Sequence, residues 1–253
     1  PGEVVRARHL SGQALDSADA AAAAAALALR HLGELGLEVV ARVLDLPADA
    51  LSGREPDPAR LAQAPLSQPD ADALYRQRVK GVYGELLAFM GRIEVSMDEE
   101  HQRYWAAAQT AAAQVVEAVK GAKHLQKNLL ARLAEQDSPQ RRAYVDLRAH
   151  LLAQMRALQA LDPEQVPPAD RAAELQRIED QAGRFDVEFR HRVLGMLRRG
   201  EIDGLQAGSL LNDLGYADRI RTGLRAPATA REPRSLRRLR HLARQEEAAP
   251  AAD

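Results

Sequence analysis

The sequence contains no cysteine, which excludes a disulfide framework, a thiolate metal site and a thiol nucleophile. Aromatic residues make up only 4% of the 253 residues, so β-strands would find few of the side chains they favour. A dominant charge sign is also missing: 35 Lys and Arg face 36 Asp and Glu, which argues against a globally basic nucleic-acid binder. Because alanine and leucine supply most apolar side chains, the composition predicts an all-α protein.

Long apolar runs and catalytic motifs are missing too. The longest apolar run, residues 20–29, is mostly alanine and is well short of the ~20 residues that cross a bilayer. The sequence has no GxSxG, no phosphate-binding glycine loop and no HExxH, so we expect a non-enzymatic protein without a cofactor. It opens at Pro1 without an initiator Met or signal peptide, and we expect a fragment of a longer protein.

Apolar residues recur at helical spacing in six segments, of which three lie in the first half. The first helix is expected to begin near Ser17 and is followed by a proline-rich stretch, residues 46–69, that predicts a long loop. The second begins about Asp70. Ser96 and Glu99 form a predicted capping box that starts a long third helix.

The second half repeats this order. The "DSPQ" sequence breaks the third helix at Ser138, a fifth helix stops at Gly200, and Asp203 with Gln206 forms a second predicted capping box. An internal duplication of three-helix units is the natural interpretation. We therefore expect a first bundle with a lead-in over residues 1–136, a second bundle over 137–225 and a basic tail over 226–253.

Four segments resemble, in the same order, the cytosolic C-terminal region of the bacterial sodium/phosphate cotransporter family, which is similar to the phosphate-regulatory protein PhoU. They are "ARHLSGQALDSADAAAAAAALALRHLGEL", "YRQRVKGVYGELLAFMGR", "AVKGAKHLQKNLL" and "SLLNDLGYADRIRTGL", and the resemblance covers nearly all of residues 7–224. It implies a PhoU-like fold of two tandem three-helix bundles at the cytoplasmic side of the cell membrane. It also implies a partner, the membrane-spanning half of a transporter in the same chain.

That resemblance implies a regulatory or interaction domain of a sodium-dependent phosphate transporter. Two alternatives stay open: a free-standing PhoU-type adaptor in phosphate signalling, and a helical scaffold with no link to phosphate. The coding sequence before Pro1 would separate the first two, because it would encode either membrane helices or a start codon.

PhoU-like proteins are associated with metal clusters held through acid-x-x-x-acid motifs, since carboxylates four apart share a helix face. In this sequence Glu117 is followed by Gly121 and Asp218 by Thr222, so each motif keeps one carboxylate and loses the other. We expect no bound metal. Glu117 and Asp218 are the residues to test first.

Two polar surfaces are candidates for docking. The first is a basic stripe opposite the apolar face of the third helix, made of Lys120, Lys123, His124 and Lys127. The second lies on the sixth helix and contains Asn212, Asp213, Tyr216 and Asp218. The stripe is either a solvated face or a docking surface for anionic lipid headgroups or acidic loops of a membrane partner. The second set is either a docking surface for the transporter or a structural seam tied by pairs such as Asp218 with Arg221 or Arg225.

After Ala226 the packing pattern fades and arginines become frequent. The segment is either a solvated tail or a basic amphipathic segment that lies on anionic lipid or docks on a partner. The arginines expected to contact lipid are Arg234, Arg237, Arg238 and Arg240. A homodimer is left open, and no nucleic-acid partner is expected.

Overall fold

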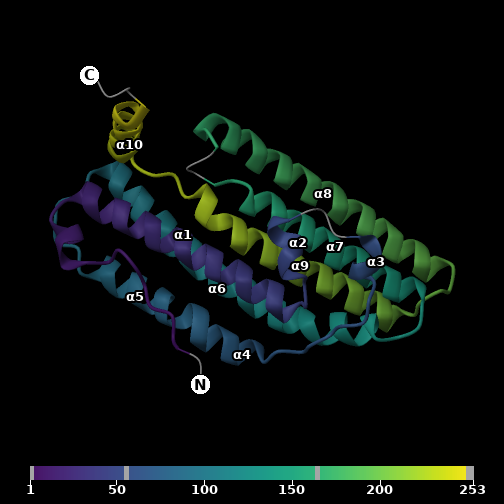
Figure 1. The fold of residues 1–253 in the computed structure, drawn as a ribbon. Coiled ribbons are helices and arrows are strands. Elements are labelled where there is room, and N and C mark those ends of the chain that lie inside the picture. Colours follow the sequence, from purple (N-terminus) through teal and green to yellow (C-terminus); the bar gives the residue numbers. More distant parts are fainter. Residues whose placement is uncertain (1–2, 54–56, 163–165, 249–253) are drawn as a thin grey trace.

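The computed structural model describes residues 3–53, 57–162 and 166–248. All regular secondary structure in these residues is helical, which confirms the all-α prediction. The elements, labelled in Figure 1 where there is room, are η1 (Gly12–Leu15), α1 (Ala18–Val43), α2 (Ala48–Ser52), α3 (Pro58–Leu61), α4 (Ala71–Leu74), η2 (Tyr75–Val79, a π-helical turn), α5 (Lys80–Gly91), α6 (Glu99–Leu133), α7 (Pro139–Gln159), α8 (Pro168–Arg198), α9 (Gly204–Thr229) and α10 (Arg234–Ala248).

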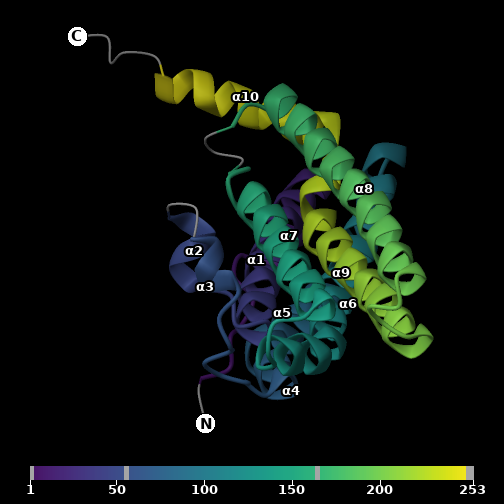
Figure 2. The same cartoon turned by 90° about the vertical axis from the view of Figure 1, so that its right-hand side faces the viewer.

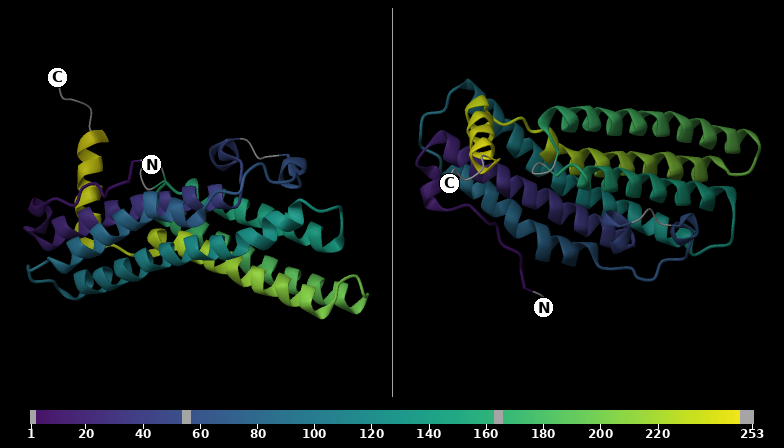
Figure 3. Two further views of the ribbon diagram at one scale, coloured as in Figure 1. Left: turned by 90° about the horizontal axis from the view of Figure 1, so that it is seen from below. Right: turned by 45° about the horizontal axis from the view of Figure 1, so that its top comes forward.

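The 35-residue helix α6 is the axis of the molecule, and at 1.5 Å per residue it is about 50 Å long. Helices α1 and α9 pack along it, with α5 beside α1 and α7 beside α9. Helix α8 packs on α7 and α9 at one edge, and α10 projects from one end of the body (Figures 2 and 3). The buried stripe of α6 follows the predicted helical spacing through Ala111, Val115, Ala118, Ala122, Leu125 and Leu129.

Side-chain caps fix most helix starts where the sequence predicts them. Ser17, Asp70 and Ser138 each accept a hydrogen bond from a backbone amide in the first turn of the helix that follows. Asp203 and Gln206 form the predicted capping box of α9. The capping box predicted at Ser96 is wrong: Asp98, two residues later, caps α6 by accepting from the amide of the third helical residue.

The proline-rich segment is more ordered than the predicted long loop, because it contains the short helices α2 and α3. Pro47 precedes α2 and Pro58 is the first residue of α3, after its capping residue Asp57, and proline is tolerated at helix starts. Arginines of α7 then fix the start and middle of this region by donating hydrogen bonds to backbone carbonyls of residues 45–61. Arg148, buried in the core, donates to the carbonyls of Leu61 and Asp45, and Arg156 donates to those of Ala50 and Gly53.

Packing becomes sparse after Ala226, as predicted, since Leu239 and Leu242 are exposed, but it does not end there. Ala226 is buried, α9 continues to Thr229 with Pro227 inside it, and the basic segment forms α10. Pro227 packs against α1, where a Cβ added at Gly33 would lie 3.1 Å from its Cγ. Leu236 of α10 is buried as well.

The hydrophobic core is continuous from α1 to α9. Leu32 of α1, Val115 of α6, Leu147 of α7 and Leu214 of α9 all belong to it. The described residues form one core and not two, so the division into tandem bundles near residue 137 stays a prediction.

Candidate functional site

The two sequence segments that best carry the family resemblance, residues 118–130 and 209–224, lie side by side. They belong to α6 and α9, which form the most extensive helix contact of the described residues and run antiparallel. The backbones come close at two glycines: a Cβ added at Gly121 would lie 3.3 Å from the carbonyl oxygen of Tyr216, and one at Gly223 only 2.2 Å from that of Gln114. This contact, which we call the α6–α9 seam, brings together three of the predicted site residues: Asp213, His124 and Tyr216.

Asp213 is in the interior of the seam, with none of its surface exposed. The Tyr144 hydroxyl donates to its Oδ2 at 2.5 Å and the Asn128 amide donates to the same oxygen at 3.0 Å. Its Oδ1 has no hydrogen-bond partner within the described residues. Burial raises the pKa of Asp213, although both hydrogen bonds favour the charged form. Asp213 is therefore not part of a docking surface.

Tyr216 and His124 meet at the surface of the seam. Their rings stack with centroids 4.9 Å apart and 15° between planes, and the Arg219 guanidinium lies 5.6 Å from the Tyr216 centroid. Asn212 is exposed on α9 nearby in sequence. One residue of the predicted basic stripe thus contacts one residue of the second predicted set, so the two candidate surfaces adjoin.

The lysines of the basic stripe are largely neutralised by acids of this chain. Lys120 pairs with Glu117 at 2.8 Å, and Lys123 pairs with Asp72 of α4 at 2.7 Å. Both pairs are exposed, so solvent screens them and they add little to stability. Of the three stripe lysines, Lys127 alone is exposed without an acidic partner among the described residues. The stripe therefore offers a partner less charge than its sequence indicates.

Asp218 belongs to an ion-pair network that ties α9 to α8. Arg221 lies 2.6 Å from Asp218 and 2.8 Å from Glu179, and Arg225 lies 3.0 Å from the same Glu179. The predicted pair of Asp218 with Arg221 is confirmed. The hydrogen bond from Arg221 lowers the pKa of Glu179 against the effect of burial. Asp218 and Glu179 are therefore both paired with arginines.

Neither remaining carboxylate of the broken metal motifs is placed to hold an ion. Glu117 pairs with Lys120, Asp218 with Arg221, and residues 3–53, 57–162 and 166–248 contain no group of three or more His, Asp or Glu side chains that could bind a metal. At residue 121 the packing leaves no room for the acidic side chain that such a metal motif would need. A Cβ at Gly121 already meets Ile220 and Tyr216 at 3.3 Å, so a longer acidic side chain would be forced into α9.

Close to the start of α10, His101 of α6 links α6 to α1 and, through Asp19, to α10. The buried ring of His101 lies between two carboxylates, with Nδ1 2.8 Å from Asp98 and Nε2 2.7 Å from Asp19 of α1. Asp19 also accepts from the hydroxyl of Ser235 at 2.6 Å. Burial lowers the pKa of His101, but the two carboxylates outweigh it and the net pKa is raised. The network fastens the start of α10 to the body.

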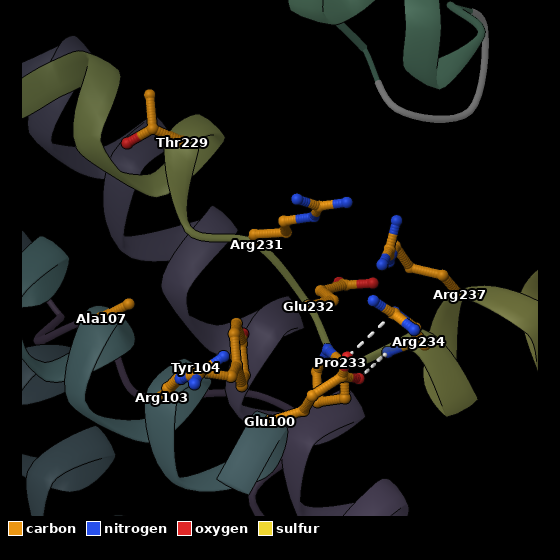
Figure 4. A pocket seen from close by; sticks show the side chains of 10 residues that line it. All are labelled: Glu100, Arg103, Tyr104, Ala107, Thr229, Arg231, Glu232, Pro233, Arg234 and Arg237. Atoms are coloured by element: carbon orange, nitrogen blue, oxygen red, sulfur yellow. Dashed lines mark hydrogen bonds and ion pairs between the residues drawn. The ribbon is translucent and has the colours of Figure 1, made fainter.

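Four arginines surround a pocket beside this network, and the sequence alone does not reveal it (Figure 4). The pocket has a volume of about 350 Å³ between the start of α6 and the segment 229–237 that joins α9 to α10. Two of the arginines predicted to contact lipid are engaged within the chain: Arg234 with Glu100 at 3.0 Å and Arg240 with Glu232 at 3.1 Å. Arg237 lines the pocket and Arg238 is exposed.

Among the described helices, none carries an apolar stretch long enough to cross a lipid bilayer. Comparison of the chain with protein-family models, curated proteins and solved structures finds no match to any of them. The resemblance to PhoU-like domains therefore rests on the sequence segments named above.

Proposed function

We propose that this chain is a non-enzymatic regulatory or interaction domain of a bacterial sodium-dependent phosphate transporter, acting at the cytoplasmic side of the membrane. One observation carries the proposal beyond the sequence. Residues 118–130 and 209–224, which are far apart in the chain and carry much of the family resemblance, pack against each other at the α6–α9 seam. If these two segments together form one structural feature of the family, they are expected to lie in contact in the folded chain, as they do here.

The polar groups of the seam also favour a binding role over a catalytic one. Asp213 is buried and bonded to Tyr144 and Asn128, and Asp218 is tied to Arg221. A general acid or base must reach the proton it transfers, and these carboxylates face their own protein partners. What the seam exposes is a small surface of His124, Tyr216, Lys127 and Asn212, which suits contact with another protein.

The test is phosphate uptake in the native host. An in-frame deletion of the coding region for this chain should alter sodium-dependent uptake of radiolabelled phosphate, or its response to phosphate starvation. Within the intact protein, Lys127→Glu should reproduce part of that effect, because it reverses the one stripe lysine without an acidic partner. Lys80→Glu, the same change on an exposed lysine of α5, should leave uptake unchanged.

Uptake that is identical in wild-type and deletion strains, in both phosphate-rich and phosphate-poor medium, would refute the link to transport and leave a helical scaffold. Where uptake does change, the coding sequence before Pro1 decides between the two transport-related functions. Membrane helices there support an attached domain, and a start codon supports a free-standing adaptor.

A further inference from the structure

The arginine-lined pocket is built by two parts of the chain that are more than a hundred residues apart. Glu100, Arg103, Tyr104 and Ala107 of α6 form one wall, and the segment from Thr229 to Arg237 forms the other. Its volume of about 350 Å³ is within the range of about 300–1,000 Å³ typical of small-molecule sites. Tyr104, Ala107 and Pro233 give it an apolar lining, while the charged groups stand around them.

Four arginines and two glutamates line this pocket, so its formal charge is positive. Both glutamates are engaged, Glu100 with Arg234 and Glu232 with Arg240. Arg103 pairs with Glu99. Two arginines are left, Arg231 and Arg237, for which the described residues provide no acidic partner.

Arg231 and Arg237 come from the linker and from α10, and Figure 4 shows their guanidinium groups turned toward each other. The Glu232 carboxylate lies near Arg237 in this view, but its ion pair is with Arg240. An anion bound by both Arg231 and Arg237 would offset the repulsion between their like charges. Guanidinium groups bind phosphoryl oxygens through paired N–H donors, which makes arginine the preferred residue for this ligand.

The pocket already binds one internal carboxylate in this manner. Glu100 accepts from the backbone amide of Arg234, the first residue of α10, at 2.9 Å and pairs with its side chain at 3.0 Å. A helix N-terminus combined with arginine side chains is a favourable environment for an oxyanion. Arg231 and Arg237 repeat the side-chain part of this arrangement without an internal carboxylate.

We propose that the pocket binds a phosphate-bearing anion, with Arg231 and Arg237 holding one phosphoryl group between them. The pocket has room for more than a single phosphate ion, so the ligand is a polyphosphate, a phosphate ester or a phospholipid headgroup. Because α6 forms one wall and the start of α10 the other, the bound anion would fix α10 against the body. This inference does not depend on the proposed role in phosphate transport.

The experiment uses the complete chain and sodium tripolyphosphate as the probe. Thermal unfolding and calorimetric titration are measured against sodium chloride at equal ionic strength, because simple screening acts on all exposed charges. We expect a saturable rise in melting temperature that chloride does not reproduce. In Arg231→Gln/Arg237→Gln, affinity should fall by about tenfold or more for each arginine removed.

The matched control is Arg184→Gln/Arg198→Gln, which removes the same charge from two exposed arginines of α8 outside the pocket. It should bind tripolyphosphate like the wild type. Far-UV circular dichroism verifies that both double variants keep their helices. Equal loss of affinity in both double variants would overturn a specific pocket. A chloride effect equal to that of tripolyphosphate would exclude a soluble polyphosphate as the ligand.

A second measurement identifies the source of the phosphoryl group. The same three proteins are sedimented with vesicles of phosphatidylcholine, with and without phosphatidylglycerol. Pocket-dependent binding to anionic vesicles but not tripolyphosphate supports the site and assigns it to lipid headgroups, and the reverse assigns it to a soluble anion. Binding to neither probe refutes the proposal.

Discussion

Replacing Gly223 by alanine should destabilise the protein, although alanine favours helices. In an α-helix, alanine is more favourable than glycine by about 0.8–1 kcal/mol. At Gly223, however, the added Cβ would lie 2.2 Å from the carbonyl oxygen of Gln114 and 2.8 Å from the Cβ of Ala118. A backbone carbonyl cannot rotate away as a side chain can, so α9 would have to move from α6.

The size of this effect follows from the packing. Ordinary contact begins at 3.4 Å, so the two helices must separate by about 1 Å at their closest point, and neighbouring contacts in the core would loosen with them. Overpacking of a well-packed core costs about 1–3 kcal/mol and occasionally more. Against the gain in helix propensity, we expect a net destabilisation of about 1–2 kcal/mol.

Two further glycines of the same contact region provide a graded series. A Cβ at Gly121 would meet its nearest neighbours at 3.3 Å, and one at Gly215 of α9 would meet nothing within 4 Å. Gly121→Ala should therefore be nearly neutral, and Gly215→Ala should stabilise the protein by about 0.5–1 kcal/mol. Urea unfolding is followed by circular dichroism and by the fluorescence of Trp105, the single tryptophan. A Gly223→Ala variant as stable as Gly215→Ala would show that the helices do not approach as described.

Three other predictions concern charge. Burial raises the pKa of Asp213, so the stability that its protonated form contributes is complete below the unfolded pKa of about 3.9 and is lost as pH rises through the folded pKa. Asp213→Asn should therefore flatten the fall of the urea midpoint with pH over this range. An unchanged pH dependence would contradict the prediction. The pKa of His101 is raised by Asp98 and Asp19 against the effect of burial, so the stability that its charged form contributes is complete below about pH 6.5 and is lost at higher pH. His101→Gln should remove this loss of stability with rising pH. A variant with the wild-type pH profile would count against the network. Elemental analysis should find no stoichiometric transition metal, and one ion per chain that disappears in Glu117→Ala or Asp218→Ala would refute this.

Local signals predicted much of the fold. The caps at Ser17, Asp70 and Ser138 and the capping box at Asp203 depend on side chains within three residues of the amides they bind, so short sequence patterns contain the information. The short helices α2 and α3 depend instead on arginines of α7 that are 87 and 106 positions away in the sequence. No local pattern records such a contact, and the prolines therefore indicated a loop.

Asp213 shows the same limit within the candidate site. Its position three residues after Leu210 and four before Ala217 placed it on the buried stripe of the helix, and this spacing was a signal against a surface role. Its hydrogen-bond partner Tyr144, however, is 69 positions earlier in the sequence. Helical spacing could reveal that Asp213 is buried, but only the packing of α7 against α9 reveals what satisfies it.

Arginines and lysines raise a related difficulty, because a run of basic residues indicates charge but not whether that charge is available to a ligand. The stripe on α6 loses two of its three lysine charges to Glu117 and Asp72. In the C-terminal segment, ion pairs engage Arg234 and Arg240, while Arg231 and Arg237 face each other across a pocket. Charge that has no partner in the fold is thus a better guide to an anion site than charge counted along the sequence. It favours this pocket, and not the α6 stripe, as the place where an anion binds.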